Sequence, residues 1–284
     1  MIKPASRLKL PTMLKPIEQL GSSTVQSLDG FGDFCHFSGR TFMWIFAGVN
    51  RLSSFRLLMA QMLEIGTKSL PVVITTGMFV GMVLAVQMAP QFKAVGMESS
   101  IGVLVTLSVL RELGPVLAGV MLAGRVGGGL TAELGTMRVT EQIDALRAMG
   151  TSPMRVLVVP RFLACLLLTP ILVIYADIMG ILGGYIISVG IYGASSPEFW
   201  HNAADKIRQF DILYGMLKSV SFGGALGLIS CYKGFRCAPG AAGVGRACTE
   251  AFVTSCMIIL ALNLFLGMLL NTIDEMLFGL RTVL

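Results

Sequence analysis

The chain has 284 residues, of which 54% are hydrophobic and only 13% are charged, whereas a soluble domain carries roughly 25% charged residues. Its net charge of +6 comes from basic residues dispersed among long apolar runs, which excludes the clustered basic face of a nucleic-acid-binding protein. A helix needs about 20 apolar residues to cross a bilayer, and the chain contains several such runs. The composition therefore predicts an all-α polytopic membrane protein.

The first 66 residues are predicted to form a cytoplasmic tail followed by interfacial helices. Residues 1–15 are polar and basic, and no apolar run with a cleavage site follows them, so we expect no cleaved signal peptide. The apolar run 41–49 is too short to span a bilayer. Residues 55–65 alternate apolar side chains with Arg56 and Glu64. Helices lying in the interface plane explain these segments better than spans. A soluble helical N-terminal domain is the alternative.

The remainder of the chain, 67–284, is predicted to be a single transmembrane domain with spans at about 69–92, 100–124, 162–190, 212–232 and 247–270. In the first span, Gly77 and Gly81 form a small-xxx-small pair that permits close helix packing. The connections 125–161 and 233–246 are rich in Lys and Arg, whereas 194–211 carries more acids than bases. The positive-inside rule thus predicts five crossings, with a cytoplasmic N-terminus and a C-terminus on the opposite side.

Two adjacent charges, Arg111 and Glu112, interrupt the second span. A charge at the bilayer centre costs at least ~2.5–3.5 kcal/mol, so each needs a partner, water or a polar cavity. Consecutive residues point about 100° apart on a helix, so each is expected to find its partner on another helix or in a cavity. Pro115 removes the backbone hydrogen bond to the Arg111 carbonyl, which predicts a kink or a carbonyl free to bind something. An interhelical bracing network and the lining of a substrate path are both open.

Three further polar residues interrupt the later spans. Lys218 is a candidate partner for Glu112 or for an anionic head group, but it is also near enough to the end of its span to snorkel outward. Asp177, near the outer end of the third span, is expected to be solvated or structural. Asn263, in the fifth span, is either an interhelical hydrogen-bonding residue or part of a site.

A short amphipathic helix is predicted between the second and third spans. Thr140 is expected to cap its start, with Glu141 in the first turn, and Gly150 with Pro153 ends it. Its apolar residues follow one face: Val139, Ile143, Leu146 and Met149. Because a helix this short is marginal alone, it must rest on the membrane face or on a soluble partner.

Motifs for catalysis, nucleotide binding or metal binding are missing from the sequence. The Gly-rich stretches 124–129 and 239–245 do not match a phosphate-binding loop. The six cysteines lack metal-ligand spacing, and His36 and His201 belong to no evident triad. We therefore expect no cofactor in this chain and no catalysis by it alone.

Long motifs resemble one known family, the MlaE-type permeases of ABC transporters that maintain lipid asymmetry. The motifs are RELGPVLAGVMLAGRVG (111–127), AELGTMRVTEQIDALRAMG (132–150), VVPRFLA (158–164), GMVLAVQ (81–87) and GVGRACTEAFVTS (243–255). The resemblance extends from about Pro71 to Leu270 and contributes little over the first sixty residues.

The resemblance implies a homodimeric permease of the bacterial inner membrane, with N-terminal elbow helices, five membrane helices and a coupling helix at 136–149. That helix would sit on a cytoplasmic P-loop ATPase, which uses the ATP and Mg. A STAS-domain protein and an MCE-domain ring are the other implied partners. The substrate would be a phospholipid, moved between the inner membrane and an MCE protein or periplasmic carrier to maintain outer-membrane lipid asymmetry.

The resemblance also implies roles for individual residues. The substrate-binding residues would be Arg111, Glu112, Lys218, Leu84, Phe92 and Asn263. The ATPase-coupling residues would be Met137, Thr140, Glu141, Gln142, Asp144 and Leu146. Several relatives carry an acid where this chain has Asn263, which puts a Lys218–acid pair across the last two helices in doubt and makes Asp177 a candidate replacement.

Two functions of other classes compete with this reading. An ion- or proton-coupled secondary transporter would use Glu112, Lys218 and Asp177 as its relay, but the chain lacks a visible inverted repeat. A membrane-embedded lipid-modifying enzyme would need a catalytic constellation that the sequence does not offer.

Overall fold

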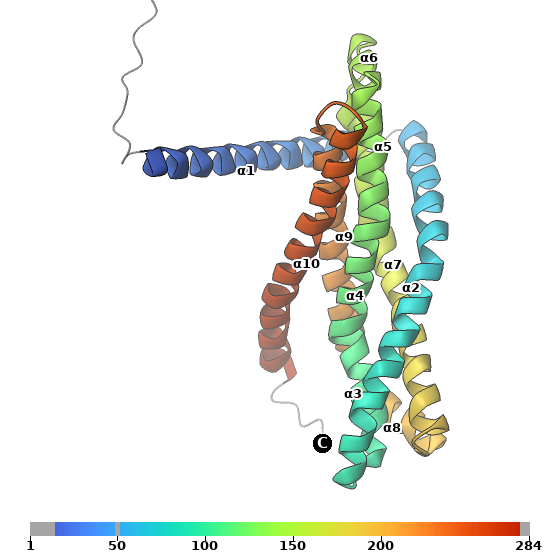
Figure 1. Ribbon diagram of the computed structural model, residues 1–284. Coiled ribbons are helices and arrows are strands. Elements are labelled where there is room, and N and C mark those ends of the chain that lie inside the picture. The colour runs from blue at the N-terminus through green and yellow to red at the C-terminus, as the bar shows by residue number, and fades with distance from the viewer. Residues whose placement is uncertain (1–14, 49–51, 279–284) are drawn as a thin grey trace, which may run out of the picture.

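The computed structural model describes residues 15–48 and 52–278, which form helices and short connections without a strand. Among these described residues, five helical segments are long and apolar enough to cross a membrane (Figure 1). They are Phe55–Ala94, Ile101–Val139, Met154–Gly190, Gln209–Phe235 and Ala241–Leu277. The predicted all-α polytopic fold with five membrane helices is thus confirmed.

The spanning segments divide into named elements. The first is α2 (Leu52–Ala94), the fourth α9 (Gln209–Phe235) and the fifth α10 (Ala241–Phe278). The second is a continuous run of α3 (Ile101–Ser108), η2 (Val109–Leu113), α4 (Gly114–Leu122), η3 (Ala123–Gly127) and α5 (Gly128–Val139). The third is η4 (Met154–Val158) followed by α7 (Val159–Gly190). The remaining elements are α1 (Lys15–Gly48), η1 (Glu98–Ser100), α6 (Gln142–Ala148) and α8 (Ser196–Lys206).

The N-terminal region differs from the prediction. Residues 55–65, expected to lie in the interface plane, belong to the same helix as the first span. The Lys68 ammonium pairs with the Glu64 carboxylate one turn earlier at 2.6 Å, so these charges support the helix instead of ending it. The helix α1 runs crosswise to the bundle, the orientation of an interfacial helix (Figure 1). Of the tail predicted for residues 1–15, residues 1–14 lie outside the described residues, and Lys15 begins α1.

The second span also runs further than expected. Residues 125–139 were assigned to a polar connection, but they extend the helix to Val139. Their charged side chains are at least partly exposed, whereas Leu130, Thr131 and Leu134 are buried. The helix α8, in the connection before α9, was not predicted at all; Phe199 and Ala203 are its buried residues.

The helices α2 and α7, which precede and follow the second span, pack closely on each other. A Cβ on Gly77 would lie 2.4 Å from the Ala176 carbonyl oxygen, and one on Gly81 would lie 1.7 Å from that of Gly180. The backbones therefore touch where the sequence places small residues four apart, as predicted.

Replacing Gly81 by Ala is expected to separate α2 from α7, because the new methyl group would overlap the Gly180 backbone and overpacking costs about 1–3 kcal/mol. The measurement is the apparent melting temperature of the purified protein in detergent. Gly128→Ala is the matched control, since a Cβ there meets nothing within 4 Å. Equal melting temperatures for the two variants would contradict the packing.

Candidate functional site

A cluster of charged and polar side chains joins the second, fourth and fifth membrane helices. We define the polar cluster by seven residues: Arg111, Glu112, Asp211, Tyr214, Lys218, Asn263 and Asp274. The sequence predicted four of them, namely Arg111, Glu112, Lys218 and Asn263. The structure brings those four together and adds Asp211, Tyr214 and Asp274.

The Arg111 guanidinium connects the beginning of α9 to the end of α10. Its Nε donates to Asp211 Oδ1 at 2.6 Å, and its Nη2 donates to the Asp274 carboxylate. Asp211 is fully buried in the first turn of α9, where its other oxygen accepts the Arg208 backbone N–H at 2.8 Å. Arg111 also lies over the Tyr214 ring, 4.9 Å from its centroid.

The Glu112 carboxylate gathers three donors from α9 and α10. Its Oε1 accepts from Lys218 Nζ at 2.7 Å and from the Tyr214 hydroxyl at 3.3 Å, and its Oε2 accepts from Asn263 Nδ2 at 3.2 Å. Lys218 is fully buried, so it does not snorkel outward. Arg111 and Glu112 thus find their partners on other helices, as their angular separation predicted.

A π-helical turn, η2, presents both charges to the neighbouring helices. Pro115 lacks an N–H, so the Arg111 carbonyl has no partner four residues ahead. Lys218 Nζ donates to that carbonyl at 3.2 Å, which confirms that it is available for binding. π-Helical turns insert an extra residue and occur frequently at functional sites.

The cluster holds the carboxylates of Glu112, Asp211 and Asp274 against two cations, and each cation already contacts an acid. Two acceptors remain: Asn263 Oδ1 and Asp274 Oδ1 are buried without a hydrogen-bond partner among the described residues. Since Asn263 donates to a carboxylate, its amide orientation is determined and its oxygen is the free atom. A ligand group with N–H or O–H donors can satisfy these two oxygens.

An apolar surface adjoins the polar cluster on α10. A Cβ on Gly267 would lie 3.7 Å from both Lys218 Nζ and the Tyr214 hydroxyl, so this glycine borders the cluster. Large apolar side chains of α10 are exposed around it: Leu260, Leu264, Phe265, Met268 and Leu269. A few polar groups therefore lie beside a wide apolar wall.

Three residues considered at the sequence level do not join the cluster. Phe92 packs in a separate apolar group with Ala89 and Ile101, and Leu84 is buried on α2, the helix that packs on α7. Asp177 is buried, so of the two expected roles, solvated or structural, only the structural one remains. Its carboxylate lies against Gly114, and Glu112 is the acid that pairs with Lys218, so Asp177 does not replace the missing acid of the last helix.

The predicted coupling helix 136–149 is two helices. The helix α5 ends at Val139, Glu141 adopts a left-handed conformation with φ of 61°, and α6 begins at Gln142. The Thr140 hydroxyl donates to the Thr136 carbonyl at 2.8 Å, so Thr140 ends α5 and does not cap α6 as expected. Gly150, with φ of 72°, ends α6 as predicted.

The apolar face of α6 rests on its own chain. Ile143 is fully buried in a cluster with Phe37, Leu134 and Leu157. The candidate coupling residues therefore divide: Met137 and Leu146 pack against this cluster, whereas Thr140, Glu141, Gln142 and Asp144 are exposed. Asp144 accepts from Arg138 of α5, which ties α6 to α5, and also from Arg147 of its own helix. The exposed set, together with Met149, which is 70% exposed, forms a free surface at this end of the bundle (Figure 1).

Removal of the Glu112 charge should destabilise the protein, because it leaves a buried ammonium unpaired. Glu112→Gln is expected to cost about 3 kcal/mol, the low end for a buried pair, since the Glu112 side chain is 44% exposed. The double variant Glu112→Gln with Lys218→Met should be more stable than Glu112→Gln alone. Thermal unfolding of the wild type, the two single variants Glu112→Gln and Lys218→Met, and the double variant in one detergent measures this coupling. Strictly additive losses would show that the pair contributes nothing.

Comparisons with known proteins agree over most of the chain. A family model described as Permease MlaE matches residues 58–269, which include the whole polar cluster except Asp274. A probable ABC transporter permease protein of Rickettsia felis is 41% identical over 255 residues, covering 88% of this chain and 96% of the relative. A probable ABC transporter permease protein of Synechocystis is 40% identical over 234 residues, covering 82% and 88%. The intermembrane phospholipid transport system permease protein MlaE of Haemophilus influenzae is 38% identical over 213 residues, covering 75% and 82%.

Proposed function

Because the chain belongs to the MlaE permease family of ABC transporters, we propose that it moves phospholipids between a bacterial inner membrane and an MCE protein or periplasmic carrier, maintaining outer-membrane lipid asymmetry. The comparisons confirm the family that the sequence motifs indicated, and with it a transport subunit in place of an enzyme. The alternative of an ion-coupled secondary transporter is therefore abandoned. The phospholipid transport named for the Haemophilus relative supports the substrate class.

The observation that carries the proposal is the polar cluster beside the apolar surface of α10. A phospholipid has a compact polar head and long apolar tails, so its site needs few polar groups next to a large apolar wall. Asn263 Oδ1 and Asp274 Oδ1 can accept hydrogen bonds from a head group, and its phosphate can compete with the carboxylates for Arg111 and Lys218. Asn263, Arg111, Glu112 and Lys218 are thus our substrate-binding residues.

The exposed apolar face of α10 supports a homodimer, with a second copy covering the open side of the polar cluster. The free surface of α6 would receive the P-loop ATPase, which supplies the ATP and Mg chemistry. A STAS-domain protein and an MCE ring complete the assembly on grounds of family resemblance alone.

The second membrane helix can transmit motion from the ATPase to the substrate. It runs without a break from the polar cluster at Glu112 to Val139, about 40 Å away, next to α6. Ile143 and the Arg138–Asp144 pair hold α6 against α5, so a displacement of α6 is passed to that helix. Each copy of the homodimer would carry one ATPase, and closure of these two ATPases would then reshape the polar cluster and expel the lipid.

Loss of the polar cluster should lower lipid occupancy. Arg111→Ala with Glu112→Ala is expected to reduce the phospholipid that co-purifies with the dimer, measured by mass spectrometry of extracted lipid. Asn263→Leu keeps every ion pair and should act in the same direction. Arg56→Ala, an exposed cation on α2, is the control. Unchanged lipid in both cluster variants would refute the site.

Positive charge introduced on the free surface of α6 should release the ATPase. Glu141→Lys with Gln142→Lys alters two exposed residues and preserves the Asp144 ion pairs that hold α6. We expect a P-loop ATPase to co-purify with the tagged wild-type chain and to be lost from this variant. Glu198→Lys on α8, at the opposite end of the bundle, is the matched control and should retain it (Figure 1). A chain that purifies without an ATPase in several mild detergents would refute the ABC assignment.

A further inference from the structure

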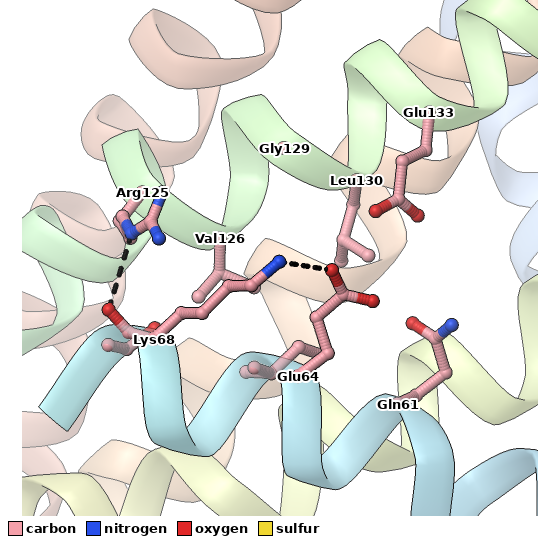
Figure 2. A pocket seen from close by; sticks show the side chains of 10 residues that line it. Gln61, Glu64, Lys68, Arg125, Val126, Gly129, Leu130 and Glu133 are labelled. Atoms are coloured by element: carbon pink, nitrogen blue, oxygen red, sulfur yellow. Dashed lines mark hydrogen bonds and ion pairs between the residues drawn. The ribbon is translucent and has the colours of Figure 1, made fainter.

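A second polar site lies between α2 and the second membrane helix, apart from the polar cluster. It is a crevice of about 210 Å³, and we call it the α2–α5 crevice. A water occupies about 30 Å³ in the liquid, so the volume suits a compact head group. Figure 2 shows its main lining residues, Gln61, Glu64 and Lys68 from α2 with Arg125, Gly129 and Glu133 from the other helix.

The crevice lies at the level where both helices leave the apolar layer. Lys68 directly precedes the apolar run that starts at Ser69, and Arg125 directly follows the run that ends at Gly124. The crosswise helix α1 meets the bundle at this same end (Figure 1). The lining charges are therefore positioned for the head-group layer of a bilayer, at the end that carries α6.

One cation in the crevice has no acid of its own. Arg125 Nε donates only to the Lys68 backbone carbonyl, at 3.4 Å, and no carboxylate of the described chain lies within ion-pair distance of its guanidinium. Like Arg111, Arg125 projects from a π-helical turn, here η3. A guanidinium at the membrane surface without a carboxylate is suited to a phosphate.

The opposite end of the crevice offers acceptors. Lys68 Nζ pairs with Glu64 Oε1 at 2.6 Å, and buried Arg161 donates to Glu133 Oε2 at 3.1 Å. The other oxygen of each carboxylate accepts no hydrogen bond from the residues the structure describes. Figure 2 shows Arg125 at one end and Glu133 with Gln61 at the other, with Lys68 and Glu64 between them. The crevice thus has a cationic end and an anionic end.

We infer that the α2–α5 crevice binds the head group of a zwitterionic phospholipid that carries a primary ammonium, as in phosphatidylethanolamine. Its phosphate accepts from Arg125 and Lys68, and its ammonium donates to Glu64, Glu133 and the Gln61 side-chain carbonyl. Exposed Val72 and Met121, one turn into the apolar layer from Lys68 and Arg125, lie where its tails begin. A quaternary ammonium has no N–H to donate, so phosphatidylcholine satisfies the acceptor end poorly.

The test is native mass spectrometry of the delipidated, detergent-solubilised protein titrated with phosphatidylethanolamine, phosphatidylcholine and phosphatidylglycerol of identical tails. We expect phosphatidylethanolamine to bind about tenfold more tightly than phosphatidylcholine, and Arg125→Gln to weaken its binding by about tenfold. Arg125→Lys should retain most of the affinity. Arg56 is an exposed cation on α2, about 18 Å along the helix before Lys68, so Arg56→Gln is the control and should leave the lipid affinities unchanged.

Glu64→Gln tests the acceptor end, and its expected result is a shift of preference from phosphatidylethanolamine toward phosphatidylglycerol. Equal affinity for the three lipids, or equal effects of Arg125→Gln and Arg56→Gln, would overturn the inference and leave only annular lipid. The outcome is independent of the proposed transport function. Binding that depends on Arg125 but not on Arg111 and Glu112 supports this site even if the polar cluster binds no lipid, and the reverse result removes this site alone.

Discussion

A charge within the bilayer must be paired, and this constraint determines how the later helices are held together. The Glu112–Lys218 pair joins the second membrane helix to α9, and Arg111 reaches both Asp211 and Asp274. The helix α10 slants away from the bundle toward its C-terminal end and exposes much of its apolar surface (Figure 1). Its attachment there depends on polar contacts, since apolar packing between helices gains little over contact with lipid. A ligand that competes for these contacts would therefore also loosen α10.

The sequence was sufficient for the five membrane helices and for the most conspicuous residues of the polar cluster, because both follow from the cost of polar groups in hydrocarbon. It was insufficient for Asp211 and Asp274, because hydropathy placed both outside the predicted spans. Asp211 lies one residue before the span 212–232, and Asp274 lies four residues after the span 247–270. A helical-face argument would have found them. Asp211, Tyr214 and Lys218 are spaced by three and four residues, and Asp274 stands three turns beyond Asn263, so each set shares one face. The turn at Glu141 had no such signal, because residues other than glycine rarely adopt positive φ.

Each of three π-helical turns in the described chain carries an arginine: Arg111 in η2, Arg125 in η3 and Arg155 in η4. Two of the turns have an evident cause. Pro115 and Pro160 each remove the hydrogen bond to a carbonyl four residues earlier, at Arg111 and Val156, inside η2 and η4. The turn η3 contains no proline and ends at Gly127, the first of the three glycines Gly127 to Gly129. Prolines and glycines in the motifs thus shape the backbone that presents the basic side chains.

The second membrane helix connects the polar cluster, the α2–α5 crevice and α6. It carries η2 at the polar cluster, η3 at the α2–α5 crevice and α5 against α6. A straight α-helix would move as a rigid rod, so a push at α6 would arrive undiminished at Glu112. Helices kink at π-helical turns, so these two turns can redirect part of that displacement. Since Lys218 binds both the Glu112 carboxylate and the Arg111 carbonyl within η2, a change in that turn alters the ion pair directly. The proposed transmission of motion from α6 to the polar cluster would therefore depend on the geometry of η2 as much as on the charges it carries.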